Sequence, residues 1–231
     1  PVFEDIGDST TDNFDNNGWG ITNTTYVSPS SSITESPNGN YQNNENKTIR
    51  LSENINLTNA IGANVTFYAK WDIENNWDYV QLEVSLDNGN SWIPQCGLFT
   101  NEGSSNGGQP TGQPLYDGTQ NNWVLEQIDL SDYLGEEITM RFKFESDGEV
   151  RADGFYFDDL TVNVLDDETL NNEDVFASQF SVYPNPVSNL LYITTPKNNY
   201  TLGIYNIQGQ LMSTPSVYSG SQTIDYSQYT K

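Results

Sequence analysis

Histidine is absent from this sequence of 231 residues, and cysteine occurs once, at Cys96. The lack of histidine excludes Ser–His and Cys–His catalysis and the usual zinc sites, all of which use an imidazole. One cysteine cannot form an intramolecular disulfide, and without a histidine to activate its thiol we interpret Cys96 as a small buried hydrophobe. Any catalysis by this chain would depend on carboxylates, tyrosine, lysine or that thiol.

Basic residues are also scarce. The sequence contains eight Lys and Arg residues and 32 Asp and Glu residues, which gives a formal net charge of −24 at pH 7. A surface of this sign repels phosphate backbones and anionic lipid headgroups, so we expect no nucleic-acid partner. The acidity suits either solubility in salty water or the binding of divalent cations, and composition alone leaves both open.

Long apolar runs and helical periodicity are missing too. No run approaches membrane-spanning length, so we expect no membrane insertion. No signal peptide is recognisable, and the chain opens at Pro1 directly into Val2-Phe3-Glu4, so we expect further sequence upstream. No long stretch has apolar residues at i, i+3, i+4 and i+7, which indicates almost no helix.

The residues that are frequent favour strands and turns. Aromatic residues make up 13% of the chain, and Asn, Ser and Gly fill the gaps between apolar runs. Short runs separated by turn clusters, as at 37–40 and 87–90, predict an all-β antiparallel sandwich. Residues 77–86, 138–144 and 156–164 alternate as a sheet with one buried face requires. In the first of these runs we predict Val80, Leu82, Val84 and Leu86 inward, and Trp77, Tyr79, Gln81, Glu83 and Ser85 outward.

The composition divides the chain into three regions. Residues 1–165 read as one large β-sandwich domain. Residues 166–177 are acidic with little to bury and predict a linker. Residues 178–231 begin a second, small Ig-like β module, which we expect to be incomplete at its C-terminus because so few residues remain. Inside the first domain, residues 98–122 are rich in Gly, Gln and Asn and predict a long surface loop.

The second module carries the most specific motif. A Tyr-Pro-Asn-Pro sequence, the alternating Leu190 and Ile193, and a hairpin over 204–211 resemble the C-terminal sorting domain of proteins exported by the type IX secretion system. The resemblance implies the type IX outer-membrane machinery as a partner, and a place outside the cell or on the outer-membrane surface of a Gram-negative bacterium. The family's final strand and basic tail are missing here, so we do not expect this segment to direct export by itself. The prolines stiffen the entry to the first strand and the glycine permits the turn; the motif residues are Tyr183, Pro184, Asn185, Pro186 and Gly209.

The first domain resembles a family along residues 2–164. Phe3-Glu4 opens it, runs at 71–74, 77–80 and 128–133 follow, and 153–160 closes it. Together they resemble the jelly-roll accessory domain, related to the MAM and immune-inhibitor-A groups, that lies C-terminal to secreted metallopeptidases of the zinc carboxypeptidase type. The resemblance implies a jelly-roll fold, a non-catalytic role and an upstream catalytic domain that holds the zinc, with no zinc in this fragment.

The resemblance also implies a structural Ca²⁺. In such domains an opening acidic residue and an Asp near the end of the last strand share the ion. First and last strands usually lie side by side, and carboxylates brought together repel unless a hard cation joins them. Solvated turn carboxylates are the alternative. The predicted ligands are Glu4, Asp5, Asp153, Asp158 and Asp159.

Residues 85–92 resemble the Asp-box hairpin, S-x-D-x-G-x-[ST]-W. An Asp side chain can tie the backbone of a tight turn, Gly takes the positive φ, and Trp packs under the loop. The motif recurs on unrelated folds, so we interpret it as structural.

Other functions stay open from the residues alone. Trp77 and Tyr79 could form an exposed platform for a glycan or protein substrate, as in a carbohydrate-binding module, unless a loop covers them. The chain could also be an adhesin or interaction module with no upstream enzyme. Asp72, Glu74 and Asp78 cluster near an aromatic run, and carboxylates about 5–10 Å apart support glycoside hydrolysis. The segment's role in the resembled family is structural, however, so we predict no catalytic residue.

Overall fold

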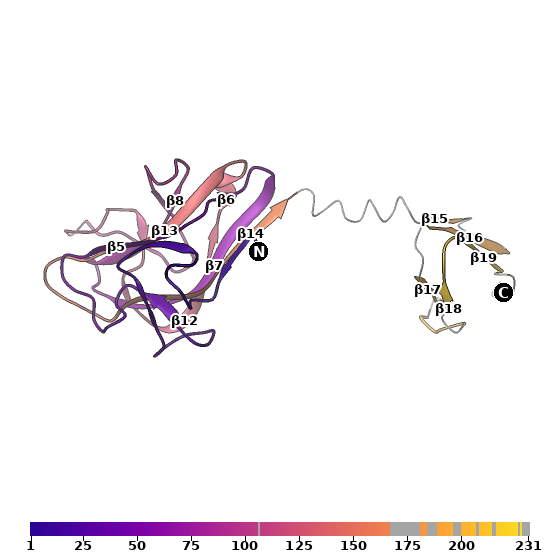
Figure 1. Cartoon of the computed structure of the whole chain (residues 1–231), viewed down its shortest axis with the longest axis horizontal. Coiled ribbons are helices and arrows are strands. Elements are labelled where there is room, and N and C mark those ends of the chain that lie inside the picture. The colour runs from indigo at the N-terminus through magenta and orange to yellow at the C-terminus, as the bar shows by residue number, and fades with distance from the viewer. Residues whose placement is uncertain are drawn as a thin grey trace. The chain divides into compact units, whose positions relative to one another are not determined.

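The computed structural model of the chain divides into two compact units, Pro1–Asp167 and Glu168–Lys231, and the labelled elements of both are strands (Figure 1). The structure describes residues 1–105, 107–166, 181–183, 189–195, 200–206, 208–213, 216–225 and 227. The prediction of an all-β antiparallel protein is confirmed, because every strand pair in this part of the chain is antiparallel. The acidic linker predicted at 166–177 lies outside the described residues, apart from Asp166.

Two sheets form the first unit. One has the order β12-β7-β14-β4-β3, with β1 paired to β14, and the other has the order β2-β5-β13-β8-β9, with β6 paired to β13. The strands of the first sheet are β1 (Phe3–Asp5), β3 (Gly20–Thr22), β4 (Ser32–Thr34), β7 (Ala60–Ile73), β12 (Gly118–Asp129) and β14 (Gly154–Asp166). Those of the second are β2 (Phe14–Asn17), β5 (Asn46–Leu51), β6 (Ile55–Asn56), β8 (Tyr79–Ser85), β9 (Ile93–Pro94) and β13 (Glu137–Glu145).

Three short elements complete this unit. β10 (Asn101–Glu102) pairs with β11 (Pro114–Leu115), and η1 (Ser131–Tyr133) is a single 3₁₀ turn. Among the described residues, no helix has the length and apolar character needed to cross a membrane.

The core lies where the two sheets face each other. β7 alternates buried and half-buried residues along its length, as expected for a strand with one face on the core. Aromatic rings from both sheets meet there: Phe142 of β13 stacks on Phe157 of β14 with ring centroids 4.4 Å apart, and Trp19 lies 5.8 Å from Phe157. These rings bury large apolar areas and hold the sheets together.

β8 departs from the one-sided pattern that its sequence predicts. All seven of its residues are buried, including Tyr79, whose exposed fraction is 4%. Leu86, predicted inward, is instead 48% exposed because the strand has ended at Ser85 and the chain turns there. Two alternatives were open for the outward Tyr79 ring, an exposed platform and a covered surface, and the structure has the covered one.

The segment that covers β8 is the one predicted as a surface loop, residues 98–122. It contains β10, β11 and the start of β12, and Leu115 and Tyr116 within it are fully buried. Tyr116 pairs with Val80 through two backbone hydrogen bonds of 3.0 and 2.8 Å. Gln81 donates a side-chain hydrogen bond to the Pro114 carbonyl at 2.9 Å. Much of this loop therefore packs against β8 instead of lying free in solvent.

The second unit has two small groups of strands. β15 (Ser181–Tyr183), β16 (Leu190–Thr194) and β19 (Gln222–Asp225) form a sheet, and β17 (Tyr200–Leu202) pairs with β18 (Ser216–Tyr218). Ile193 of β16 is its one buried apolar side chain among the described residues.

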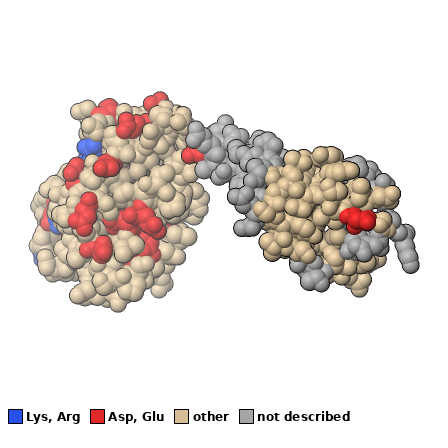
Figure 2. Space-filling model, turned by 45° about the vertical axis from the view of Figure 1, so that its right-hand side comes forward, with Lys and Arg blue, Asp and Glu red and all other residues tan. Residues whose placement is uncertain are grey.

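Acidic side chains are concentrated in the first unit. Residues 1–167 contain 28 of the 32 Asp and Glu but six of the eight Lys and Arg. Red side chains accordingly far outnumber blue ones on the face shown in Figure 2.

Candidate functional site

The first and last strands of the sandwich lie side by side, as the calcium prediction required. β1 pairs with β14, with Glu4 opposite Thr161 and Asp5 opposite Leu160. Asp158 lies beside this pairing, at a register shift in β14 where Asp159 takes a positive φ of 50°.

The carboxylates of Asp5 and Asp158 converge on the Gly7 turn, where protein donors already bind them. Asp5 accepts the Gly7 N–H at 2.9 Å and the Asn13 amide at 2.7 Å. Asp158 Oδ2 accepts the N–H groups of Val27 and Ser28 at 2.6 and 3.0 Å, and its Oδ1 accepts that of Asp159. Both side chains therefore anchor loops through main-chain N–H groups. Burial raises the pKa of Asp158, while the Val27 and Ser28 N–H groups oppose that shift.

The other three predicted ligands are more open. Glu4 and Asp153 are exposed and Asp159 is half-buried. Asp153 precedes β14, where its carbonyl accepts the Ser36 hydroxyl. Among the described residues, the one trio of acidic side chains with ligand atoms within 4.8 Å of each other contains none of the five predicted ligands.

The predicted aromatic platform does not form a pair of exposed rings. Tyr79 is buried and its hydroxyl donates to Glu145. Trp77 remains 42% exposed, but the backbone at Gly107 packs so closely on its ring that a Cβ there would overlap it. The alternative that a loop covers this surface is therefore correct for Tyr79 and partly correct for Trp77.

The acidic trio consists of Glu74, Asp78 and Asp147. Glu74 follows β7, Asp78 precedes β8, and Asp147 follows β13. A turn places the first two close together, since the Trp77 and Asp78 N–H groups donate to the Glu74 carbonyl. The Asp147 N–H donates to Asp78 Oδ1 at 2.6 Å, which fixes the third residue beside them.

Buried oxygen atoms without hydrogen-bond partners gather at this end of the sandwich. The Asp78 side chain is fully buried, and its Oδ2 has no hydrogen-bond partner. Glu74 is half-buried, and its Oε2 atom also has no hydrogen-bond partner. A third such atom is Oδ1 of Asn43, whose amide donates to the Gly148 carbonyl beside Asp147. Three of the four partnerless buried polar side-chain atoms found among the described residues therefore flank one loop. Such atoms are rare in native proteins because each loses its hydration without compensation.

The pKa values of two members of the trio, Glu74 and Asp78, are raised. Burial raises the pKa of Glu74, and the charges of Asp147 and Asp78 raise it further. Burial also raises the pKa of Asp78, against which the Asp147 N–H and the Tyr41 hydroxyl act. The third residue, Asp147, is 69 positions from Asp78, so the sequence pattern around 72–78 could show two members of the trio and not the third.

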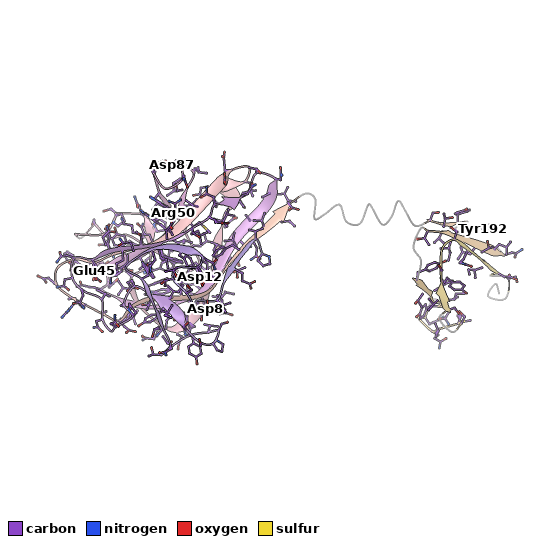
Figure 3. All side chains as sticks on the ribbon, in the orientation of Figure 1. Asp8, Asp12, Glu45, Arg50, Asp87 and Tyr192 are labelled. Carbon is purple, nitrogen blue, oxygen red and sulfur yellow. The ribbon has the colours of Figure 1, made fainter. Side chains whose placement is uncertain are left out.

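The Asp-box hairpin has the predicted structural form. Asp87 accepts the Ser91 N–H at 2.8 Å and its hydroxyl at 2.6 Å, and these bonds lower the pKa of Asp87 to about 2. Gly89 has a φ of 92°, and Trp92 donates from its ring to the Gly89 carbonyl. Figure 3 labels Asp87 on this hairpin. Arg141 lies over the Trp92 ring at 4.1 Å from its centroid, so that face of the ring is occupied.

Cys96 is exposed, which corrects its interpretation as a buried hydrophobe. It lies two residues after β9, where the chain leaves the second sheet, so its side chain does not enter the core.

Part of the sorting motif can be located. Tyr183 stacks on Tyr192 with ring centroids 5.4 Å apart. Gly209 has a φ of 79° and donates to the Asn206 carbonyl, which confirms the predicted turn. Pro184, Asn185 and Pro186 lie outside the described residues.

Two known families match the chain. Residues 20–182 match the family described as immune inhibitor A-like, MAM domain, and residues 181–231 match the secretion system C-terminal sorting domain. Both resemblances noted in the sequence are thereby confirmed.

Individual relatives share only part of their length with the chain. The pre-pro-metalloprotease PrtV of Vibrio cholerae is 29% identical over 133 residues, which are 57% of this chain and 14% of that protein. Bacillopeptidase F of Bacillus subtilis is 26% identical over 54% of this chain and 7% of its own length. Among solved structures, the K2 cleaved adhesin domain of Lys-gingipain has a TM-score of 0.44 at 13% identity, covering 70% of this chain and 98% of that one.

Proposed function

The chain belongs to the immune inhibitor A-like MAM domain family, and we propose that it is the non-catalytic accessory and export region of a larger secreted enzyme. The observation that carries the proposal is the succession of two family matches, an accessory domain over 20–182 and a secretion sorting domain over 181–231. The sorting domain indicates an extracellular or cell-surface protein. Its partner is then the type IX secretion machinery of the outer membrane of a Gram-negative bacterium.

The enzyme is proposed to be a metallopeptidase. Relatives of the first unit bear the names of a metalloprotease and a peptidase. The chain contains no histidine, so imidazole ligands for a catalytic zinc would have to come from another part of the protein. In this arrangement the sandwich positions the catalytic domain or holds its polymeric substrate.

Export is tested by deletion in the natural host. Codons 181–231 are deleted from the gene that encodes this chain. We expect the shortened protein to stay in the periplasm, while the intact protein reaches the medium or the cell surface. Fractionation and immunoblotting with an antibody against residues 1–166 measure the distribution. Unchanged export of the deleted protein would refute the sorting role.

The accessory role is tested by a comparison of two substrates. Removal of residues 1–166 from the whole enzyme is expected to lower kcat/KM for a folded protein substrate by about tenfold or more, and to leave kcat/KM for a short chromogenic peptide nearly unchanged. Equal losses on both substrates would show that the unit supports the catalytic domain's folding instead of substrate handling.

The calcium site of the resembled family stays a prediction for Glu4, Asp5, Asp153, Asp158 and Asp159. The approach of β1 to β14 supports it, and the N–H donors already bound to Asp5 and Asp158 compete with it. Calcium binding that calorimetry finds unchanged in Asp159→Ala would exclude this ligand set.

Carbohydrate binding, as a module of a glycan-degrading enzyme or as an adhesin, is the second candidate. The partly exposed ring of Trp77 favours it, and the burial of Tyr79 weakens it. Glycan-array binding by the full chain that is lost in Trp77→Ala would establish this function in place of the accessory role.

A further inference from the structure

The Glu74, Asp78 and Asp147 trio lies where the chain crosses between the two sheets. Glu74 and Asp78 bound the turn from β7, in the first sheet, to β8, in the second. Asp147 lies in the return connection, from β13 in the second sheet to β14 in the first. One point at the end of the sandwich thus gathers both crossings.

The spacing of the trio fits a calcium ion. Two oxygens bound to one ion can be separated by at most twice the metal–oxygen distance, which for Ca²⁺ is about 4.6–5.2 Å and for Mg²⁺ about 4.0–4.2 Å. The ligand atoms of the three carboxylates lie within 4.8 Å of one another, a spread that one calcium ion can bridge. With carboxylate oxygens and no His or Cys in the set, the donors are those of a hard cation and not of zinc.

A second observation, independent of the clustering, also points to a ligand. Asp78 is fully buried, and its Oδ2 has no hydrogen-bond partner. Asp5 and Asp158 are buried as well, but backbone N–H groups bind both. Both carboxylate oxygens of Asp5 and of Asp158 have a donor, whereas Asp78 has one at Oδ1, from the Asp147 N–H, and none at Oδ2. A bound cation would supply the missing partner of Oδ2.

We propose that Glu74, Asp78 and Asp147 form a Ca²⁺ site that ties the β7–β8 turn to the β13–β14 connection. The ion replaces the lost hydration of Asp78 and Glu74 and cancels the repulsion among three carboxylates. Its function is to fasten the two sheets at their crossing end, in a chain that has no disulfide to do so. This site is separate from the five ligands that the family resemblance predicts, and it does not depend on the proposed function.

The test combines calorimetry with thermal unfolding of the full chain. After treatment with a chelator and dialysis, CaCl₂ is titrated at about 0.15 M NaCl, and we expect a Kd in the range of about 10⁻⁴–10⁻³ M that is usual for extracellular modules. Asp147→Asn and Glu74→Gln are expected to weaken binding at least tenfold. Asp12→Asn is the matched control, because it removes one exposed charge outside both predicted ligand sets and should bind calcium as the wild type does. Asp159→Asn distinguishes the two sets, because it removes one charge from the other one.

Thermal unfolding gives a signature that general destabilisation cannot imitate. In chelator, each trio variant should melt at or above the wild-type temperature, because one of three repelling charges is gone. At a calcium concentration of about 100 times Kd, the wild type should gain about 5–10 °C and the variants little. The proposal is overturned if wild type binds no calcium up to about 10 mM, a concentration well above that Kd range. It is also overturned if Asp147→Asn and Glu74→Gln bind within twofold of wild type, or if Asp159→Asn alone abolishes binding.

Discussion

Glu126 offers the sharpest test of how the segment that covers β8 is anchored. Its carboxylate is fully buried in β12 and accepts four hydrogen bonds. Oε1 accepts the N–H groups of Leu98 and Gln127 at 2.6 and 2.8 Å. Oε2 accepts the Phe99 N–H and the Tyr116 hydroxyl, both at 3.0 Å. One side chain thus fastens the start of the covering segment to the first sheet.

The substitution Glu126→Gln turns one acceptor oxygen into a donor. The least harmful orientation puts the new NH₂ group at the Oε2 position, because the Tyr116 hydroxyl can rotate to accept from it. The Phe99 N–H then still loses its acceptor, which costs about 1–3 kcal/mol, and the remaining bonds lose the added strength of a charged acceptor. We expect the free energy of unfolding to fall by about 3 kcal/mol, or the Tm by about 6–12 °C for a unit of this size.

Tryptophan fluorescence during urea unfolding of the full chain is a suitable assay, since all five tryptophans lie between residues 19 and 123 and report on the first unit alone. Glu102→Gln is the matched control, because it removes the same charge at an exposed position of β10. The control should stay within about 0.5 kcal/mol of wild type. If both variants unfold at the same urea concentration, the four hydrogen bonds do not anchor the segment and the reasoning is wrong.

Three further predictions concern the first unit. Burial raises the pKa of Glu35 from 4.5 to about 8; the folded chain then keeps a proton that the unfolded chain releases, so stability should fall between these values by about 1.4 kcal/mol per pH unit. Urea midpoints at pH 5 and pH 8 should show a smaller difference in Glu35→Gln, and an unaltered difference would contradict the assignment. Phe142→Ala removes the ring that stacks on Phe157 and should lower the free energy of unfolding by about 3–5 kcal/mol, whereas a loss below about 1 kcal/mol would mean that the core refills the space. Gly7→Ala should destabilise by about 1–3 kcal/mol, because φ is 72° there and a Cβ would meet Asp158 Oδ1 at 2.8 Å; wild-type stability would show that the turn relaxes freely.

Local patterns in the sequence were enough to predict the sandwich, and in places its details. Alternation places the inward residues of β13 correctly, and the Asp-box spacing predicts the hairpin at Asp87 and Gly89. The glycine of the sorting motif predicts the turn at Gly209. Each of these features depends on interactions within a few residues or on a strand's own two faces.

The errors have a common physical origin in contacts between distant segments. A period of two shows which residues of β8 share a face, but it cannot show that residues 98–122 pack against the strand, which is why the sequence left the exposure of Tyr79 open. The acidic trio is the same case, since Asp147 approaches Asp78 only after both sheet crossings are folded. Cys96 was predicted to be buried because cysteine is common in protein cores, but it lies just beyond the end of β9 and is exposed.

The buried carboxylates that anchor loops have a consequence for how far the sequence of this domain can drift. Asp158 and Glu126 hold the loops at 27–28 and 98–99 by main-chain N–H groups, which every residue except proline provides. A loop held in this way keeps its path whatever its side chains are. Randomising residues 27, 28, 98 and 99, proline excepted, should therefore leave the loops in place, so that the scaffold can accept new surface chemistry at these two loops without being rebuilt.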